Sequence, residues 1–208
     1  MKRHILFIII FLTASTSIFA QSAEELYTNI VNKTKSFKNI EIAFEYKMIN
    51  KQAGINESMN GTGFMQGNAY RLNVNGQEMI SDGTTLWTYL TDDQEVMVSN
   101  VNQAENSGSP LAIIDSYNDN VKINFIDKGI SDVQTIEIKT IKKDEKFDRI
   151  KISVNKKTLE IKSVHVFDNN GNEFVYELFK FVTDQELPAD FFTFDEKRHP
   201  DVDVIDMR

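Results

Sequence analysis

Residues 40–48 read IEIAFEYKM. Aliphatic and aromatic side chains stand at the even positions of this stretch, and Glu, Ala and Lys stand between them. An alternation of period two is typical of a β-strand with one dry face and one wet face. The stretch therefore predicts a strand that covers a core on one side only.

The same alternation recurs in YRLNV at residues 70–74, in VKINF at 121–125 and in IKISV at 150–154. Turn signals of the hairpin kind lie between such stretches, and strands with short connections are expected to pair as antiparallel neighbours in one meander. The turn signals are Asn75-Gly76, Asp82-Gly83, Asp92-Asp93, residues 155–157 and residues 169–171.

Two helices are expected to interrupt the strands. Residues 23–38 place their apolar side chains on one side of a 3.6-residue period, with Glu in the first turn and Lys toward the end, which complements the helix dipole. Ser109 as the cap and Pro110 at the first position predict a shorter helix that runs to Tyr117. A further turn is expected at residues 188–192.

These elements predict a mainly β (α+β) fold, an open, incomplete antiparallel β-barrel with covering helices on its concave side. Alternation breaks at Leu178-Phe179 and at residues 96–98, where both sides of a strand carry apolar residues. Two interpretations stay open at this point. One is an ordinary core with a bulge, and the other is an apolar cavity of the kind found in carriers of lipid-like ligands.

The composition of the 208 residues excludes several classes of protein. The chain has no Cys, so disulfide scaffolds, Cys-ligated metals, thiol nucleophiles and a lipid-modified N-terminal cysteine are excluded. The formal net charge of -8 argues against a nucleic-acid partner, because neutralising phosphates requires a basic surface.

Residues 1–20 are expected to form a secretory signal peptide. Lys2 and Arg3 supply the positive start, an apolar run of eight follows, and Ala20 suits the position before the cut. Such a run is too short for a membrane span, which needs about 20 apolar residues. Cleavage would remove Lys2 and Arg3, take the net charge from -8 to -10, and leave residues 21–208 as a single domain outside the cytoplasm.

Catalytic and metal-binding patterns are scarce. After cleavage two histidines remain, His165 within a strand and His199 before Pro200, and neither has a second His close in sequence. The acidic residues from Asp195 to Asp206 lack the glycine and spacing of a calcium loop. We expect no enzyme activity, no cofactor and no metal.

Several motifs occur along the chain in an order known from one protein family. The stretch ISDGTTLWTY at residues 80–89 is similar to that family's "SDGkTlWxY", and GTGF at 61–64 resembles its "GxG" strand entry. SPLAII at 109–114 looks like its middle helix. ADFFTF at 189–194, followed by PDVDVID at 200–206, resembles its close. By these motifs the chain resembles the LolA family of outer-membrane lipoprotein carriers.

The resemblance implies a periplasmic chaperone that shields lipoprotein acyl chains and carries them from the inner to the outer membrane. The implied partners are acylated lipoproteins, an inner-membrane ABC-type release complex and an outer-membrane acceptor, and the carrier would be a monomer. The methionines, among them Met79 and Met97, would suit a site that adapts to variable chains. The side chains expected to line the lipid cavity are Phe44, Tyr46, Tyr70, Leu72, Trp87, Tyr89, Leu111 and Ile114.

One departure and one alternative accompany this resemblance. Family members carry an Arg-Pro turn whose Arg latches the lid, whereas this chain has MQGN at residues 65–68 and no Arg there. Arg71 is not equivalent, because it lies within the expected strand. The alternative is a periplasmic lipid-sensing or regulatory module of the same fold. The lipid-anchored acceptor of this fold is disfavoured because the chain has no Cys.

Overall fold

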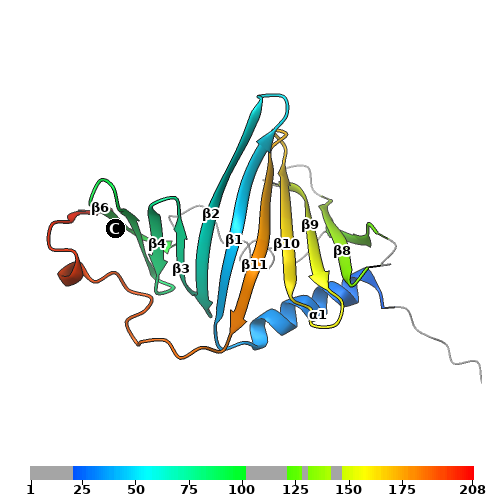
Figure 1. The fold of residues 1–208 in the computed structure, drawn as a ribbon, viewed down its shortest axis with the longest axis horizontal. Helices are drawn as coiled ribbons and strands as arrows, with labels where there is room; N and C mark the ends of the chain where they lie inside the picture. The colour runs from blue at the N-terminus through cyan, green and yellow to red at the C-terminus, as the bar shows by residue number, and fades with distance from the viewer. Residues whose placement is uncertain (1–20, 102–120, 128–130, 142–146) are drawn as a thin grey trace, which may run out of the picture.

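The computed structural model describes residues 21–101, 121–127, 131–141 and 147–208. Its strands form one open sheet of 12 strands in the order β12-β6-β5-β4-β3-β2-β1-β11-β10-β9-β8-β7 (Figure 1). The strands are β1 (Ile40–Asn50), β2 (Ile55–Gln66), β3 (Ala69–Val74), β4 (Gln77–Ser81), β5 (Thr85–Leu90), β6 (Glu95–Asn100), β7 (Val121–Phe125), β8 (Val133–Thr140), β9 (Phe147–Asn155), β10 (Ile161–Asp168), β11 (Glu173–Thr183) and β12 (Asp203–Asp206). The expected mainly β class, an open sheet with helical cover, is confirmed.

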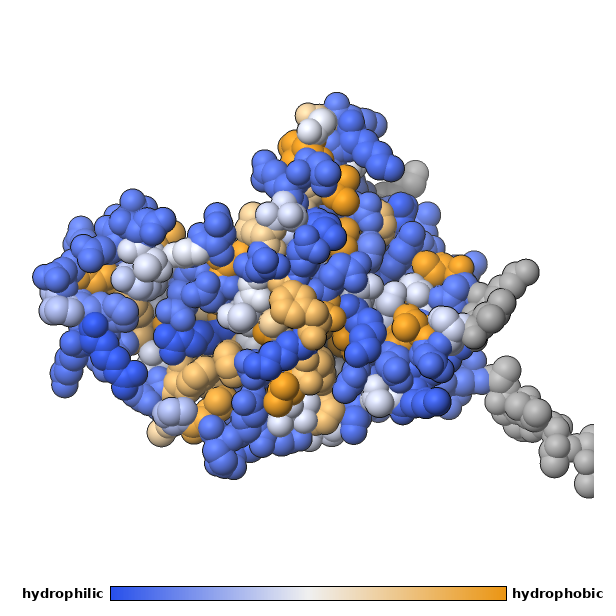
Figure 2. Space-filling model, in the orientation of Figure 1, coloured by the Kyte–Doolittle hydropathy of each residue, from blue (hydrophilic) through white to orange (hydrophobic). Residues whose placement is uncertain are grey.

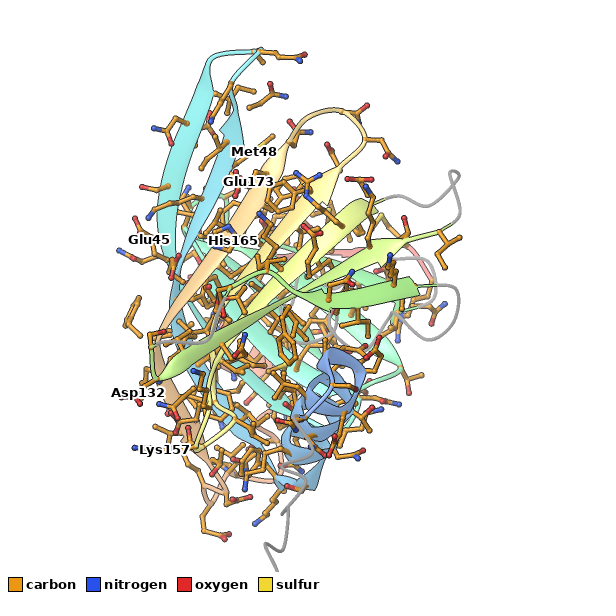
Figure 3. The ribbon with its side chains drawn as sticks, turned by 90° about the vertical axis from the view of Figure 1, so that its right-hand side faces the viewer. Glu45, Met48, Asp132, Lys157, His165 and Glu173 are labelled. Atoms are coloured by element: carbon orange, nitrogen blue, oxygen red, sulfur yellow. The ribbon has the colours of Figure 1, made fainter. Side chains whose placement is uncertain are left out.

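The helix α1 (Ala23–Ser36) lies across one face of the sheet, which we call the inner face (Figures 1 and 3). Ser22 caps the helix by accepting a hydrogen bond from the backbone N–H of Glu25 at 3.0 Å. The helix ends before Phe37, which is extended, so the predicted helix is confirmed to within two residues. Glutamates in the first turn and lysines in the last turn complement the helix dipole as expected.

The main core lies between α1 and the inner face. The even-numbered residues of β1 point to this face, as the alternation in residues 40–48 predicts. Leu26 and Ile30 of α1 pack against them and against buried aliphatic residues of the strands from β7 to β10. Those aliphatic residues are Ile123, Ile136, Ile138, Ile150, Ile152, Val154, Ile161, Val164 and Val166.

Two glycines in β2 make the close packing of this core possible. Gly61 pairs with Phe44 and Gly63 pairs with Ile42, so both glycines lie on the inner face. A Cβ added to Gly61 would stand 2.6 Å from Cζ of Phe44 and 2.9 Å from Cγ2 of Val74. The missing side chain lets the Phe44 ring lie over the neighbouring strand. The "GxG" stretch therefore lies within a strand and has a packing role.

The predicted hairpin turns are confirmed. Asn75 and Gly76 both have positive φ, 50° and 79°, as a two-residue type I′ turn requires. In the loop between β4 and β5, Ser81 Oγ accepts from the N–H of Gly83, and Asp82 Oδ1 accepts from two backbone N–H groups at 2.8 Å. The "SDG" motif therefore fixes the loop that sets the register between β4 and β5.

The expectation of an entirely antiparallel meander is wrong for β12. This strand pairs with β6 in parallel, because residues 184–202 leave β11, cross the sheet and approach β6 from the far side (Figure 1). We call residues 184–202 the C-terminal segment. The expected turn lies within it, where the N–H of Phe191 donates to the carbonyl of Pro188 at 3.1 Å.

The two breaks in alternation have different causes. In β11 the register shifts, so Ala43 pairs with Lys180 and Phe44 pairs with Leu178, and Phe179 is the extra residue. The bulge interpretation is confirmed there. In β6, Val96 and Val98 are buried on the face opposite α1. The adjacent Met97 faces the inner side, so both sides of β6 carry apolar residues.

Several predictions lie outside the described residues: the signal peptide at 1–20 and the helix at 109–117, which carries Leu111 and Ile114. Among the residues that are described, no helix is both long and apolar enough to cross a membrane.

Candidate functional site

An aromatic cluster crosses the inner face where β1 and β11 pair. Tyr176 lies between Phe44 and Tyr46, with ring centroids 5.7 Å and 5.2 Å away, and Tyr46 stacks on Phe174 at 6.4 Å. Phe44 is fully buried, whereas Tyr46 and Phe174 are only half-buried. The cluster is therefore closed toward the centre of the sheet and partly open toward the ends of the strands.

The apolar surface continues across β2, β3 and β4. Tyr70 pairs with Met65, Leu72 pairs with Gly63 and with Met79, and all of these residues face the inner side. Tyr70 and Leu72 are buried, and the two methionines are partly buried against the same core. Flexible methionines beside rigid rings suit a surface that meets variable apolar shapes.

The inner-face tyrosines are in a dry environment. Burial raises the pKa of Tyr176, and the neighbouring Tyr46 adds to the shift. Burial also raises the pKa of Tyr70 and of Tyr46, the latter with a contribution from the carboxylate of Glu57. Each shift has desolvation as its largest cause, so charged groups are disfavoured on this face.

The structure brings together four of the predicted cavity residues and separates two. Phe44, Tyr46, Tyr70 and Leu72 lie on the inner face. Tyr89 pairs with Glu78 and Trp87 with Ile80, and these partners lie on the opposite face, which we call the outer face. The prediction that Trp87 and Tyr89 line the same cavity is therefore wrong for both.

The physical reason is the pairing register of two successive hairpins, β3 with β4 and β4 with β5. Leu72 on the inner face pairs with Met79, and Met79 pairs with Thr88. Thr88 is thus the inner residue of its strand, and both of its neighbours point outward. Trp87 and Tyr89 therefore share one face of β5, and that face is the outer one.

The C-terminal segment covers these outward-facing residues. Tyr89 packs against Phe194 at 5.3 Å and against His199 at 4.9 Å, and Phe194 stacks on His199 at 4.9 Å. We call the apolar residues gathered here the outer cluster: Ile80, Tyr89, Val96 and Phe194, with Trp87 and Val202 at its edge.

Arg71 fastens this segment to the outer face. Its Nε lies 2.7 Å from Oε1 of Glu78, and its Nη1 donates to the carbonyl of Phe191 at 3.1 Å. The guanidinium also lies over the Phe191 ring, 5.4 Å from its centroid, and Phe191 meets Phe64 edge-on at 4.9 Å. The position of Arg71 within β3 is as expected.

The two histidines lie in different surroundings on the outer face. His165 Nδ1 lies 2.9 Å from Oε1 of Glu173 on the outer face, as Figure 3 shows, and His199 stacks in the outer cluster. Within the described ranges no three His, Asp or Glu side chains gather as a metal site would require. Of the acidic residues near the end of the chain, Asp195 contacts Arg198 and Asp206 contacts Arg208.

Sequence reasoning missed three inner-face residues of β11: Phe174, Tyr176 and Leu178. The available signal was the alternation of residues 173–178, which reads EFVYEL. Its apolar even positions fall on one face, but Val175 between them obscured the pattern.

These features define a class of protein: an open antiparallel sheet, covered by a helix on a broad apolar face and by a C-terminal segment on part of the other. The chain belongs to the family described as outer membrane lipoprotein carrier protein LolA, whose profile matches residues 35–195. The resemblance inferred from the motifs is thereby confirmed. This is a family of carriers.

Two relatives illustrate how far the similarity extends. The outer-membrane lipoprotein carrier protein of Francisella philomiragia subsp. philomiragia is 26% identical over 213 residues, which cover 99% of this chain and 98% of the relative. The carrier protein of the same name from Legionella pneumophila strain Lens is 23% identical over 95% of this chain and 97% of its own.

Among solved structures, an uncharacterized conserved protein from Thermus thermophilus superposes with a TM-score of 0.56 at 10% identity. The match covers 86% of this chain and 98% of the Thermus protein. At this identity the similarity concerns the fold alone.

Proposed function

We propose that this protein is a periplasmic carrier that shields the acyl chains of lipoproteins and takes them from the inner to the outer membrane. It would receive cargo from an inner-membrane ABC-type release complex and pass it to an outer-membrane acceptor, as a monomer, without a cofactor and without a catalytic step. The chain would act as one domain, residues 21–208, after loss of the signal peptide at residues 1–20.

The observation that supports this proposal most directly is the continuous apolar inner face. It runs from β8 to β4 and carries a fringe of half-buried residues: Tyr46, Met65, Met79, Phe174 and Leu178. Exposing one acyl chain of about 16 carbons to water costs on the order of 12 kcal/mol at ~0.8 kcal/mol per CH₂. A carrier must cover that surface, and a dry face of this breadth suits the task.

The way in which α1 covers the inner face also fits release of the cargo. The sheet strands pair with one another through continuous ladders, whereas α1 packs on the sheet through buried side chains such as Leu26 and Ile30. Side-chain packing can separate without breaking backbone hydrogen bonds, so α1 is the element of the described core that can move at the lowest cost. Cargo that binds the state with α1 displaced would shift the population toward it.

A transfer experiment tests the proposal. The mature chain is mixed with membranes that contain a triacylated lipoprotein, the release complex and ATP, and the soluble fraction is assayed for a one-to-one complex. Phe174→Asp would bury a carboxylate on the inner face and is expected to lower the yield at least about tenfold. Phe179→Asp is the matched control, since Phe179 is in the same strand and 69% exposed.

The outcomes separate the alternatives. No soluble complex with the wild-type chain would overturn the carrier proposal. Binding of free diacyl lipid without extraction of a lipoprotein would favour a lipid-sensing module instead. An equal loss in Phe174→Asp and Phe179→Asp would show that the inner face is not where the acyl chains bind.

A further inference from the structure

A cavity of about 510 Å³ opens on the outer face at the end of the sheet away from α1. Its floor is a row of residues across four strands, in which Ile49 pairs with Glu173, Glu173 with Phe167, and Phe167 with Arg149. Its walls are the turn after β1, with Lys51 and Gln52, and the turn at residues 168–172. We call it the outer-face cavity.

The two walls are fixed in position by side-chain hydrogen bonds. Asn50 Nδ2 donates to Oδ1 of Asn172 at 2.7 Å and so ties one turn to the other. Asp168 accepts from the N–H groups of Asn170 and Asn172, both at 2.8 Å, and from Nδ2 of Asn172 at 2.7 Å. The cavity is therefore preformed, which lowers the entropic cost of binding.

Within the floor, the planar guanidinium of Arg149 stacks on the ring of Phe167. Its guanidinium carbon lies 4.2 Å from the centroid of the Phe167 ring, so the two planar groups are in contact. Nη1 donates to Oδ2 of Asp148 at 2.9 Å, and Nε lies 3.8 Å from Oε2 of Glu137. The guanidinium, which is part of the cavity lining, is therefore held by three neighbours, and it carries five N–H donors in a fixed plane.

The charge of the lining excludes several ligand classes. Two cations, Lys51 and Arg149, face three carboxylates, Asp148, Asp168 and Glu173. An anion would meet the carboxylates, and a cation would meet Lys51 and Arg149. An acyl chain would remove water from five charged side chains and offer them no hydrogen bond in return, which is costly. The size is within the range of small-molecule sites, about 300–1,000 Å³.

We propose that the outer-face cavity binds a neutral saccharide. Sugar hydroxyls both donate and accept, so they can pair with the carboxylates and with the Lys51 and Arg149 donors without bringing charge. The apolar C–H surface of a sugar ring fits against Ile49 and the flat Arg149–Phe167 pair. The site lies on the opposite face from the proposed lipid surface and does not depend on it.

The test is a titration of the lipid-free protein, followed by backbone amide shifts in NMR, with cellobiose and with N,N′-diacetylchitobiose. We expect shifts at Lys51, Gln52 and residues 168–173, with a Kd of about 1 mM or lower for at least one of the two sugars. The double variant Lys51→Ala/Gln52→Ala changes only exposed side chains and should weaken binding at least about fivefold.

Lys47→Ala is the control, because Lys47 is on the same face of β1 but outside the lining. Three results would overturn the proposal: no shifts at the lining with either sugar, equal weakening by Lys47→Ala and the double variant, or the same shifts with sodium phosphate alone. Failure of the lipoprotein-transfer experiment would leave this titration unaffected.

Discussion

The main core between α1 and the inner face, which we call the inner cluster, and the outer cluster are both apolar. The two clusters are covered in different ways. Among the described residues, α1 covers the inner cluster, and Tyr46, Met65, Met79, Phe174 and Leu178 lie half-buried at its edge. The C-terminal segment covers the outer cluster and is held by backbone pairing of β12 with β6, by Arg71 and by aromatic stacking. Apolar side-chain packing holds the first cover, and a backbone ladder joins the second to the sheet.

The exposed surface follows the same division. Figure 2, which shows the outer face, is mainly blue over the upper part of the middle strands, where Lys47 pairs with Glu45 and His165 with Glu173, and shows an apolar patch at the lower centre. Exposed apolar residues there are few among the described ones: Phe179 in the bulge and Val182 near the end of β11. The broader apolar surface thus lies on the inner side, and the outer side carries the ion pairs and the C-terminal segment.

The largest difference between the two clusters should appear when one large ring is removed from each. Phe44→Ala leaves a cavity in the centre of the inner core, where the side chain is 1% exposed, and should cost about 3–5 kcal/mol of unfolding free energy. Phe194→Ala should cost less, about 2–3 kcal/mol, because the surface segment can collapse onto the gap. Urea unfolding measures both, and an equal or larger loss for Phe194→Ala would contradict the comparison.

Adding a methyl group to the inner face should have the next largest effect. Gly61→Ala places a Cβ within 3.0 Å of Phe44 and Val74, and we expect a loss of about 1–3 kcal/mol from overpacking. Gly63→Ala is the matched control, since its nearest neighbour is Cγ1 of Ile42 at 3.2 Å. If both variants lose the same stability in urea, the close approach at Gly61 is not what limits this strand.

Weakening the attachment of the C-terminal segment to the outer face should cost less unfolding free energy. Arg71→Ala removes the ion pair with Glu78 and the hydrogen bond to Phe191, for an expected loss of about 1–2 kcal/mol. Amide exchange within residues 188–202 should quicken more than exchange in β8 or β9. Arg198→Ala, whose side chain is 69% exposed, should change stability by less than about 0.5 kcal/mol. Unchanged exchange in Arg71→Ala would mean that other contacts hold the segment.

Alkaline pH should weaken the inner cluster gradually. Tyr46, Tyr70 and Tyr176 have pKa values raised by burial, so the unfolded chain releases their protons first, near pH 10. The stability they contribute is complete below that pH and is lost as the pH rises above it, by up to about 1.4 kcal/mol per pH unit for each tyrosine. Tyr176→Phe should flatten the slope, measured as the urea midpoint against pH; an unchanged slope would contradict the burial argument.

How much of the arrangement of the two faces can be predicted from the sequence depends on how many residues connect the elements that pack or pair. Alternation in residues 40–48 defines β1, and the Ser22 cap with its acidic first turn defines α1. Both signals are local. The parallel pairing of β12 is not local, because the C-terminal segment separates it from β11 and has no hairpin turn that would fix its direction.

The face of the sheet on which Trp87 lies is a case between these local and non-local signals. Val74 pairs with Gln77 across a two-residue turn, and Ser81 pairs with Leu86 across a four-residue loop. Residues that pair across a hairpin share a face, so each loop with an even number of residues switches the inward positions between even and odd numbers. Counting from Leu72 therefore places Thr88 inward and Trp87 outward. The loop length between β4 and β5 follows from the Asp82 hydrogen bonds, which alternation alone does not reveal.

The smallest expected effect is the sharpest test of which face binds lipid. Trp87 is the single tryptophan of the chain and lies on the outer face beside the outer cluster. If acyl chains bind the inner face, its fluorescence maximum should stay unchanged when a diacyl lipid is added. In the double variant Trp87→Phe/Tyr46→Trp, the same lipid should shift the maximum to shorter wavelength, because the new indole loses contact with water on the inner face. A shift in the wild-type chain and none in the double variant would instead place the lipid under the C-terminal segment, and the roles of the two faces would be exchanged.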